Sequence, residues 1–197
     1  MISVFDIFKI GVGPSSSHTV GPMKAGQCFV DALIANQRLT DVDRVTVDVY
    51  GSLSLTGKGH HTDIAIIMGL AGNSPETVDI DAIPSFVKRV EDTEQLPLGE
   101  QQHVVTFLRD GGMNFHQTNL SLHENGMRIH AWQGDECVLS KTYYSIGGGF
   151  IVEEAEFGQP AMQAVQVPYD FNSADGLLAL NARNRFFYQR LSDGQHA

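Results

Sequence analysis

A short segment of the sequence gathers five small side chains that carry hydroxyl or imidazole groups. The segment is GPSSSHTVGP, and its polar members are Ser15, Ser16, Ser17, His18 and Thr19. Hydroxyl groups suit a carboxylate or a phosphate, especially beside the free backbone N–H groups at the start of a helix. His18 adds a group that exchanges a proton near neutral pH. These residue types predict a site for an anionic ligand, with simple capping of a helix start as the structural alternative.

A nucleophilic serine activated by His18 is a third interpretation of the same segment. Such a serine is recognised by its geometry with a histidine and an acid, and often by a G-x-S-x-G turn. The segment has no G-x-S-x-G sequence. We therefore do not expect hydrolase chemistry here.

A second polar loop, GSLSLTGKGHHTD at residues 51–63, contains two adjacent histidines. Neighbouring side chains point in different directions, so at most one of His60 and His61 is expected to serve a given site. The H-E-x-x-H spacing of a helical zinc site is absent, and we predict no metal ligands in this loop. We expect one histidine to act as a general base, with Thr62 or Asp63 capping the following helix and orienting it.

A third candidate loop leaves a strand through three consecutive glycines, in SIGGGFIVEE at residues 145–154. Such a run costs chain entropy and indicates positive φ angles or a close backbone approach. It matches neither the G-x-G-x-x-G nor the Walker pattern, so dinucleotide binding is not expected. The remaining histidines lie in predicted strands or hairpins and are expected to be surface or packing residues: His103, His116, His123 and His130.

Hydrophobic periodicity predicts the elements that hold these loops. Apolar residues at helical intervals indicate helices at about 19–36, 61–72 and 81–95, the last with Pro84 in its first turn. Alternation in RVTVDVYGS predicts a strand that is buried on one face. Each of the first two polar loops therefore leads into a helix.

The sequence after Pro97 changes to strands separated by hairpin-type turns. The expected strands are HVVTFLRD, GMNFHQT, GMRIHAW and CVLSKTYYSI, and this half is predicted to be antiparallel. From about Phe157 the pattern weakens into a linker and tail. The whole pattern predicts an α/β fold of the α+β sandwich type, in which helices pack on a mixed or antiparallel sheet.

Composition limits the possible partners. The chain has 197 residues, two cysteines and a formal net charge of −10. This charge disfavours binding to nucleic acid or to an anionic membrane surface, and no apolar stretch is long enough to span a membrane. Cys28 and Cys137 lie in unlike contexts, so neither a disulfide nor a thiolate metal cage is expected. The start of the chain does not resemble a signal peptide, and we expect a cytoplasmic protein.

Three long segments resemble one known family. FDIFKIGVGPSSSHTVGPMKAG, VDVYGSLSLTGKGHHTDIAIIMGLAG and KTYYSIGGGFIV are similar to the N-terminal (β) domain of bacterial iron–sulfur-dependent L-serine dehydratases, over about residues 1–175. That domain is similar to the allosteric substrate-binding domain of phosphoglycerate dehydrogenase. The resemblance implies a β domain at 1–155 and a linker or tail at 156–197 that leads toward a helical α domain. It also implies elimination of L-serine to pyruvate and ammonia.

The same resemblance implies roles for individual residues. His61, or alternatively His18, would take the α-proton of serine, while an open iron of a [4Fe–4S] cluster would act as Lewis acid on the β-hydroxyl. The cluster ligands belong to the α domain, so we expect this chain alone to bind no iron and to show no turnover. The groups expected to bind the substrate or close over it are Ser15, Ser16, Ser17, Thr19, His60, Thr62, Asp63, Ser145, Gly147, Gly148 and Gly149.

Two kinds of function remain open at this point. In the first, the chain is half of an enzyme whose partners are L-serine and the α domain, and it forms a homodimer. In the second, it is a regulatory module that binds serine and dimerises without catalysis of its own.

Overall fold

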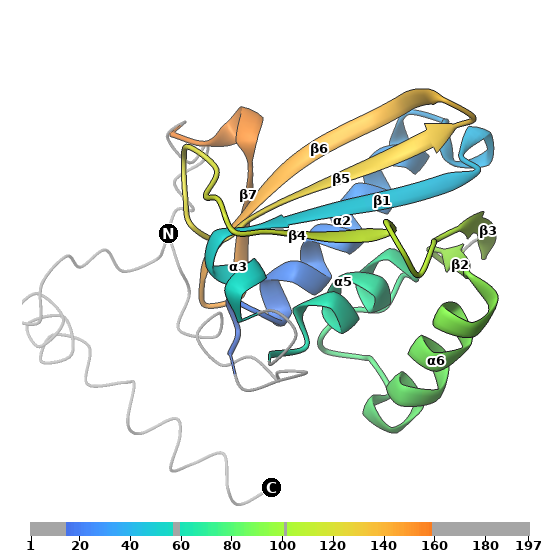
Figure 1. Cartoon of the computed structure of the whole chain (residues 1–197), viewed down its shortest axis with the longest axis horizontal. Coiled ribbons are helices and arrows are strands. Elements are labelled where there is room, and N and C mark those ends of the chain that lie inside the picture. The colour runs from blue at the N-terminus through green and yellow to red at the C-terminus, as the bar shows by residue number, and fades with distance from the viewer. Residues whose placement is uncertain (1–14, 57–59, 101, 159–197) are drawn as a thin grey trace, which may run out of the picture. The chain divides into compact units, whose positions relative to one another are not determined.

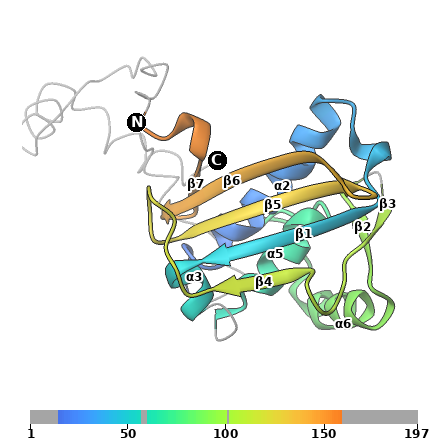
Figure 2. The same ribbon diagram turned by 45° about the horizontal axis from the view of Figure 1, so that its top comes forward.

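The computed structural model describes residues 15–56, 60–100 and 102–158, which form a sheet with helices against one of its faces (Figures 1 and 2). None of the helices in this part is long and apolar enough to cross a membrane. The chain order is α2 (Val20–Ala35), η1 (Leu39–Asp41), β1 (Arg44–Tyr50), α3 (Gly51–Leu55), α5 (Thr62–Leu70), η2 (Ile80–Ala82), α6 (Ile83–Thr93), β2 (Gln95–Leu98), β3 (His103–Thr106), β4 (Met113–His116), β5 (Gly126–Gln133), β6 (Glu136–Gly147), β7 (Phe150–Glu153) and η3 (Glu154–Glu156).

The sheet is mixed and is centred on β1. Within the described residues it has seven strands in the order β2-β3-β1-β5-β6-β7, with β4 also paired to β1. The pairs β2–β3, β5–β6 and β6–β7 are antiparallel, and β5–β6 is the hairpin that the QGDE turn predicts. However, β3 and β4 lie parallel to β1, so the expectation of a wholly antiparallel second half is wrong. The helices between β1 and β3 form a crossover that returns the chain in the same direction.

Alternation along β1 sends its valines into the core. Val45, Val47 and Val49 are fully buried, and they belong to one apolar cluster with Phe29 of α2 and Ile66 of α5. Helices α2 and α5 lie on the same side of the sheet and cover the face onto which these valines point (Figure 2). The main core lies between that face and the two helices.

Helices α2 and α5 touch backbone to backbone at two glycines. A Cβ atom on Gly69 would overlap the carbonyl oxygen of Met23, and one on Gly26 would lie 2.8 Å from the carbonyl oxygen of Ile66. Only glycine permits this approach without moving a helix. The crossing sets where the first turns of both helices lie, and those turns carry two of the polar loops.

The three helices predicted by periodicity are confirmed, and two elements differ from prediction. Helix α3 occupies a segment expected to be loop. It begins at Gly51, whose φ of +55° turns the chain sharply and whose N–H donates to the carbonyl of Thr118 at 3.0 Å. Strand β2 lies at the edge of the sheet and includes Pro97, a position where a missing N–H is tolerated.

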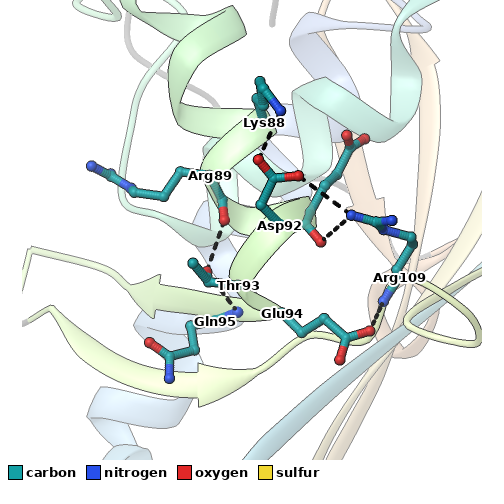
Figure 3. Close-up of polar contacts among 8 residues, drawn as sticks. Lys88, Arg89, Asp92, Thr93, Glu94, Gln95 and Arg109 are labelled. Carbon is teal, nitrogen blue, oxygen red and sulfur yellow. Dashed lines mark hydrogen bonds and ion pairs between the residues drawn. The ribbon is translucent and has the colours of Figure 1, made fainter.

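Helix α6 is tied to the β3–β4 connection by Arg109. Its side chain donates to the carbonyl of Glu91 at 2.9 Å and pairs with Asp92 at 3.4 Å, and its backbone N–H donates to Glu94 at 3.0 Å (Figure 3). Lys88, one turn earlier, bonds to the same Asp92 carboxylate at 2.7 Å and lowers the pKa of that carboxyl. These contacts fix the end of α6 where the chain enters the edge strands.

On the sheet face away from the helices, polar and aromatic side chains form hydrogen bonds and stack on one another. Asp48 accepts hydrogen bonds from His116 at 2.7 Å and from His130 at 3.2 Å, and Tyr50 stacks on the His116 ring at 4.6 Å. Burial lowers the pKa of His130, although Asp48 opposes this effect. His116 and His130 are thus partly buried residues on the sheet surface that pair with Asp48, in agreement with the prediction that they are surface or packing residues.

Candidate functional site

The first polar segment forms a tight turn, which we call the serine loop (residues 15–19), at the start of α2. The N–H groups of His18 and Thr19 both donate to the carbonyl of Ser15, at 3.1 and 3.0 Å. The Nδ1 atom of His18 lies 2.9 Å from the hydroxyl of Ser17 and 3.3 Å from that of Ser15. The loop therefore holds its own imidazole with two serine hydroxyl groups.

Three fully buried hydroxyl groups bind the backbone of the serine loop. They come from three different parts of the chain: the end of the loop itself, the first turn of α5 and the end of β6. Each donates to a different carbonyl, in the pairs Thr19 to Ser15 (2.8 Å), Thr62 to His18 (2.8 Å) and Ser145 to Ser17 (2.7 Å). These bonds join the three polar loops at one end of the sheet (Figure 1).

The imidazole of His18 lies between α3 and the start of α5. Its Nε2 atom is 3.3 Å from the hydroxyl of Ser52, and its ring centroid is 5.3 Å from that of His60. Burial lowers the pKa of His18, and His60 lowers it further, while Ser52 and Glu124 oppose the shift. The Nδ1 atom of His60 is buried and has no hydrogen-bond partner among the residues that the structure describes. The site thus holds a neutral imidazole at pH 7 beside a second ring with an unused nitrogen.

The β4–β5 connection forms hydrogen bonds with two residues next to the serine loop, Ser52 and Ser145. The N–H of Ser52 donates to the carbonyl of Glu124 at 3.0 Å. Asn125 holds Ser145 through two bonds, accepting from its N–H at 2.9 Å and donating from Nδ2 to its carbonyl at 3.2 Å. Ser52 and Asn125 were not expected in the site, although Ser52 falls within the second polar loop and Asn125 within a predicted hairpin turn.

His61 and Asp63 border this network, and the predicted cap of α5 is wrong. The N-cap residue is the exposed His61, with a left-handed φ of +61°, and no side chain caps the helix. The hydroxyl of Thr62 is used by the serine loop instead, while the Asp63 carboxylate accepts from the next N–H, of Ile64, at 2.9 Å. The serine loop also lacks a side-chain cap for α2, because Thr19 bonds to Ser15.

The glycine run, which starts two residues after Ser145, ends β6 and forms the turn into β7. Gly147, Gly148 and Gly149 all have positive φ angles, of 100°, 60° and 76°, as the sequence predicts. Ser16 contributes a carbonyl that accepts from the N–H of Gly21 at 3.0 Å, and its side chain is half-buried. The structure therefore brings the three predicted loops together, with Ser15, Ser17, His18, Thr19, His60, Thr62 and Ser145 in one network.

The sequence of this chain is similar to those of known L-serine dehydratases. L-serine dehydratase 1 of Escherichia coli is 69% identical over 179 residues, which cover 91% of this chain and 39% of that protein. L-serine dehydratase TdcG of the same organism is 59% identical, and the L-serine dehydratase of Haemophilus influenzae is 55% identical, with similar coverage. The chain thus spans about two fifths of the length of these relatives. The family model of the serine dehydratase beta chain matches residues 3–156, and the chain belongs to this family.

Proposed function

We propose that this chain supplies one side of the active site of an L-serine dehydratase, which converts L-serine into pyruvate and ammonia. The observation that carries the proposal is the joining of three polar loops around His18 in a chain of this family. Because the chain spans about two fifths of its relatives, the other groups of the site are expected in the remaining part of the full-length enzyme.

The reaction requires a base at the α-carbon. Removal of the α-proton and departure of the β-hydroxyl give an enamine, which tautomerises to an imine and takes up water to yield pyruvate and ammonia. We assign the base to His61, because its imidazole is exposed at the start of α5 and is free to approach a substrate. His18 is the alternative: its pKa is lowered, so it is neutral, but both of its ring nitrogens already contact serine hydroxyls.

The half-buried serines of the loop are the groups that we assign to substrate binding. The hydroxyls of Ser15, Ser16 and Ser17 lie at the start of α2, where the helix dipole favours the carboxylate of serine. His60 offers its unpartnered Nδ1 to the same ligand. We propose that Asp63 and the glycine run at 147–149 line the edge of this site.

The three buried hydroxyls have a different role in this proposal. Thr19, Thr62 and Ser145 are fully buried, and each hydroxyl donates its proton to a loop carbonyl. We therefore infer that they position the serine loop instead of touching the substrate.

The [4Fe–4S] cluster that the resemblance implies does not fit the residues of this site. Hydroxyl and imidazole groups line it, whereas cluster irons are held mainly by cysteine thiolates. Cys28 lies on α2 and Cys137 on β6, and both are free and exposed. No group of three or more His, Cys, Asp or Glu side chains suited to a metal ion occurs in the described ranges. We propose that the cluster belongs to an α domain that binds this chain, in a cytoplasmic, dimeric enzyme.

The test is an assay of this chain together with the remaining part of a full-length relative. Release of pyruvate and ammonia from L-serine under anaerobic conditions is the expected result. His61→Ala should lower kcat by about 10²–10⁴-fold, the range for loss of a general base. The control His103→Ala should not, because the His103 ring bonds to the carbonyl of Val42, before the start of β1 at the other end of the sheet. A change of less than about tenfold would overturn the assignment to His61.

If the assembled enzyme shows no turnover, the proposed function is wrong. Calorimetric binding of L-serine to this chain alone would then favour the regulatory module.

A further inference from the structure

Three exposed aliphatic side chains belong to segments at the end of the sheet where the serine loop lies. Leu55 is 69% exposed, Ile146 is 47% exposed and Leu122 is 43% exposed. Side chains of this size and exposure are unusual as a group, although single ones are common on protein surfaces. We call these three residues the aliphatic rim.

Each residue of the aliphatic rim belongs to a segment that builds the candidate site. Leu55 ends α3, three residues after Ser52, which contacts the imidazole of His18. Ile146 directly follows Ser145, whose hydroxyl binds the serine loop. Leu122 lies in the β4–β5 connection, whose backbone accepts hydrogen bonds from the first turn of α3 and from the end of β6. The rim is therefore fixed to the same network as the site.

We propose that the aliphatic rim is the surface through which this chain binds the remaining part of the full-length L-serine dehydratase; the inference rests on the proposed function. The relatives extend well beyond the matched region, and this chain covers 39% of L-serine dehydratase 1 of Escherichia coli. The covering surface must reach the serine loop if it is to complete the site. Its contact on this chain consists of three exposed aliphatic side chains on the segments that also hold the serine loop.

An apolar contact surface beside a polar site has a physical reason, because polar and aliphatic groups contribute differently to binding when they lose water. Hydroxyl and imidazole groups lose water when a partner covers them, so their burial gives little net affinity. Burial of aliphatic area supplies the favourable free energy of association. Closure by the rim also removes bulk water from the serine loop, which strengthens the electrostatic interactions within the site.

The experiment measures the affinity of this chain for the remaining part of L-serine dehydratase 1, produced as a separate polypeptide. Leu55→Asp and Ile146→Asp each place a carboxylate in the proposed contact and should weaken binding by at least about tenfold. Two matched controls lie on other elements: Ile80→Asp in η2 and Val104→Asp in β3, at 55% and 54% exposure. The controls should bind as the unsubstituted chain does, and thermal unfolding should show that all four variants fold.

The proposal is overturned if the unsubstituted chain does not bind, if the rim variants bind with unchanged affinity, or if the controls weaken binding equally. It is also overturned if sedimentation shows that the rim joins two copies of this chain while affinity for the remaining part is unchanged. Turnover of the unsubstituted complex distinguishes a failure of this inference from a failure of the proposed function. Rim-sensitive binding without turnover in the unsubstituted complex would leave the contact surface valid and the proposed function wrong.

Discussion

Replacement of Thr62 by valine tests whether a buried hydroxyl holds the serine loop against α5. The side chain is fully buried, and its hydroxyl donates to the carbonyl of His18 at 2.8 Å. Valine has nearly the same shape, so the substitution removes one donor without opening a cavity. The His18 carbonyl then loses this partner while the packing of α5 is preserved.

The size of the effect follows from the desolvation of that carbonyl. A buried acceptor left without a partner costs about 1–3 kcal/mol, and because the carbonyl of His18 is only partly buried we expect about 1–2 kcal/mol. For a chain of this size, each kcal/mol lowers Tm by about 2–4 °C, so Thr62→Val should lower Tm by about 2–8 °C. Activity of the assembled enzyme should fall as well, because His18 and the serine hydroxyls lose their fixed position.

The matched control is Thr56→Val, which removes the same kind of bond at an exposed position. Thr56 donates to the carbonyl of Ser52 at 2.9 Å. Water can replace an exposed donor, so the control should change the free energy of unfolding by less than about 0.5 kcal/mol. Urea unfolding of both variants gives the comparison. Equal losses for Thr62→Val and Thr56→Val would refute the conclusion that this hydroxyl anchors the loop.

Three further predictions concern the same part of the fold. Gly21→Ala places a methyl group onto the hydroxyl of Ser145 and should lower the free energy of unfolding by about 1–3 kcal/mol, despite better helix propensity. Strictly additive effects with Ser145→Ala in a double-mutant cycle would contradict this clash. Gly69→Ala drives a methyl group into the backbone of α2 and should cost about 3 kcal/mol or more in thermal melts, and an unchanged Tm would argue against the close crossing. Because the pKa of His18 is lowered in the folded chain, the unfolded chain binds the proton first as pH falls below about 6.5. The unsubstituted chain should therefore lose stability relative to His18→Gln below that pH, and parallel stability curves would count against a buried neutral imidazole.

The helices and the central strand were predictable because their signals are local. Apolar spacing marks α2, α5 and α6, and alternation marks β1, since each pattern reflects burial of one face. The short helix α3 and the edge strand β2 depend instead on distant partners. Gly51 is held by the carbonyl of Thr118, and β2 pairs with β3 despite Pro97. The parallel pairing of β1 with β3 and β4 likewise has no local signature.

The sequence indicated which loops are polar, but it did not indicate which hydroxyls remain available to a ligand. A turn as tight as the serine loop exposes carbonyl groups that no helix or strand can satisfy, and such groups need donors when the loop is buried. Thr62 and Ser145 meet that need from elements distant in the chain, so their function depends on tertiary contacts that spacing does not reveal. A hydroxyl-rich composition at this end of the sheet therefore serves two purposes at once. Buried hydroxyls shape the loop, and we propose that the half-buried serines of that loop bind the substrate.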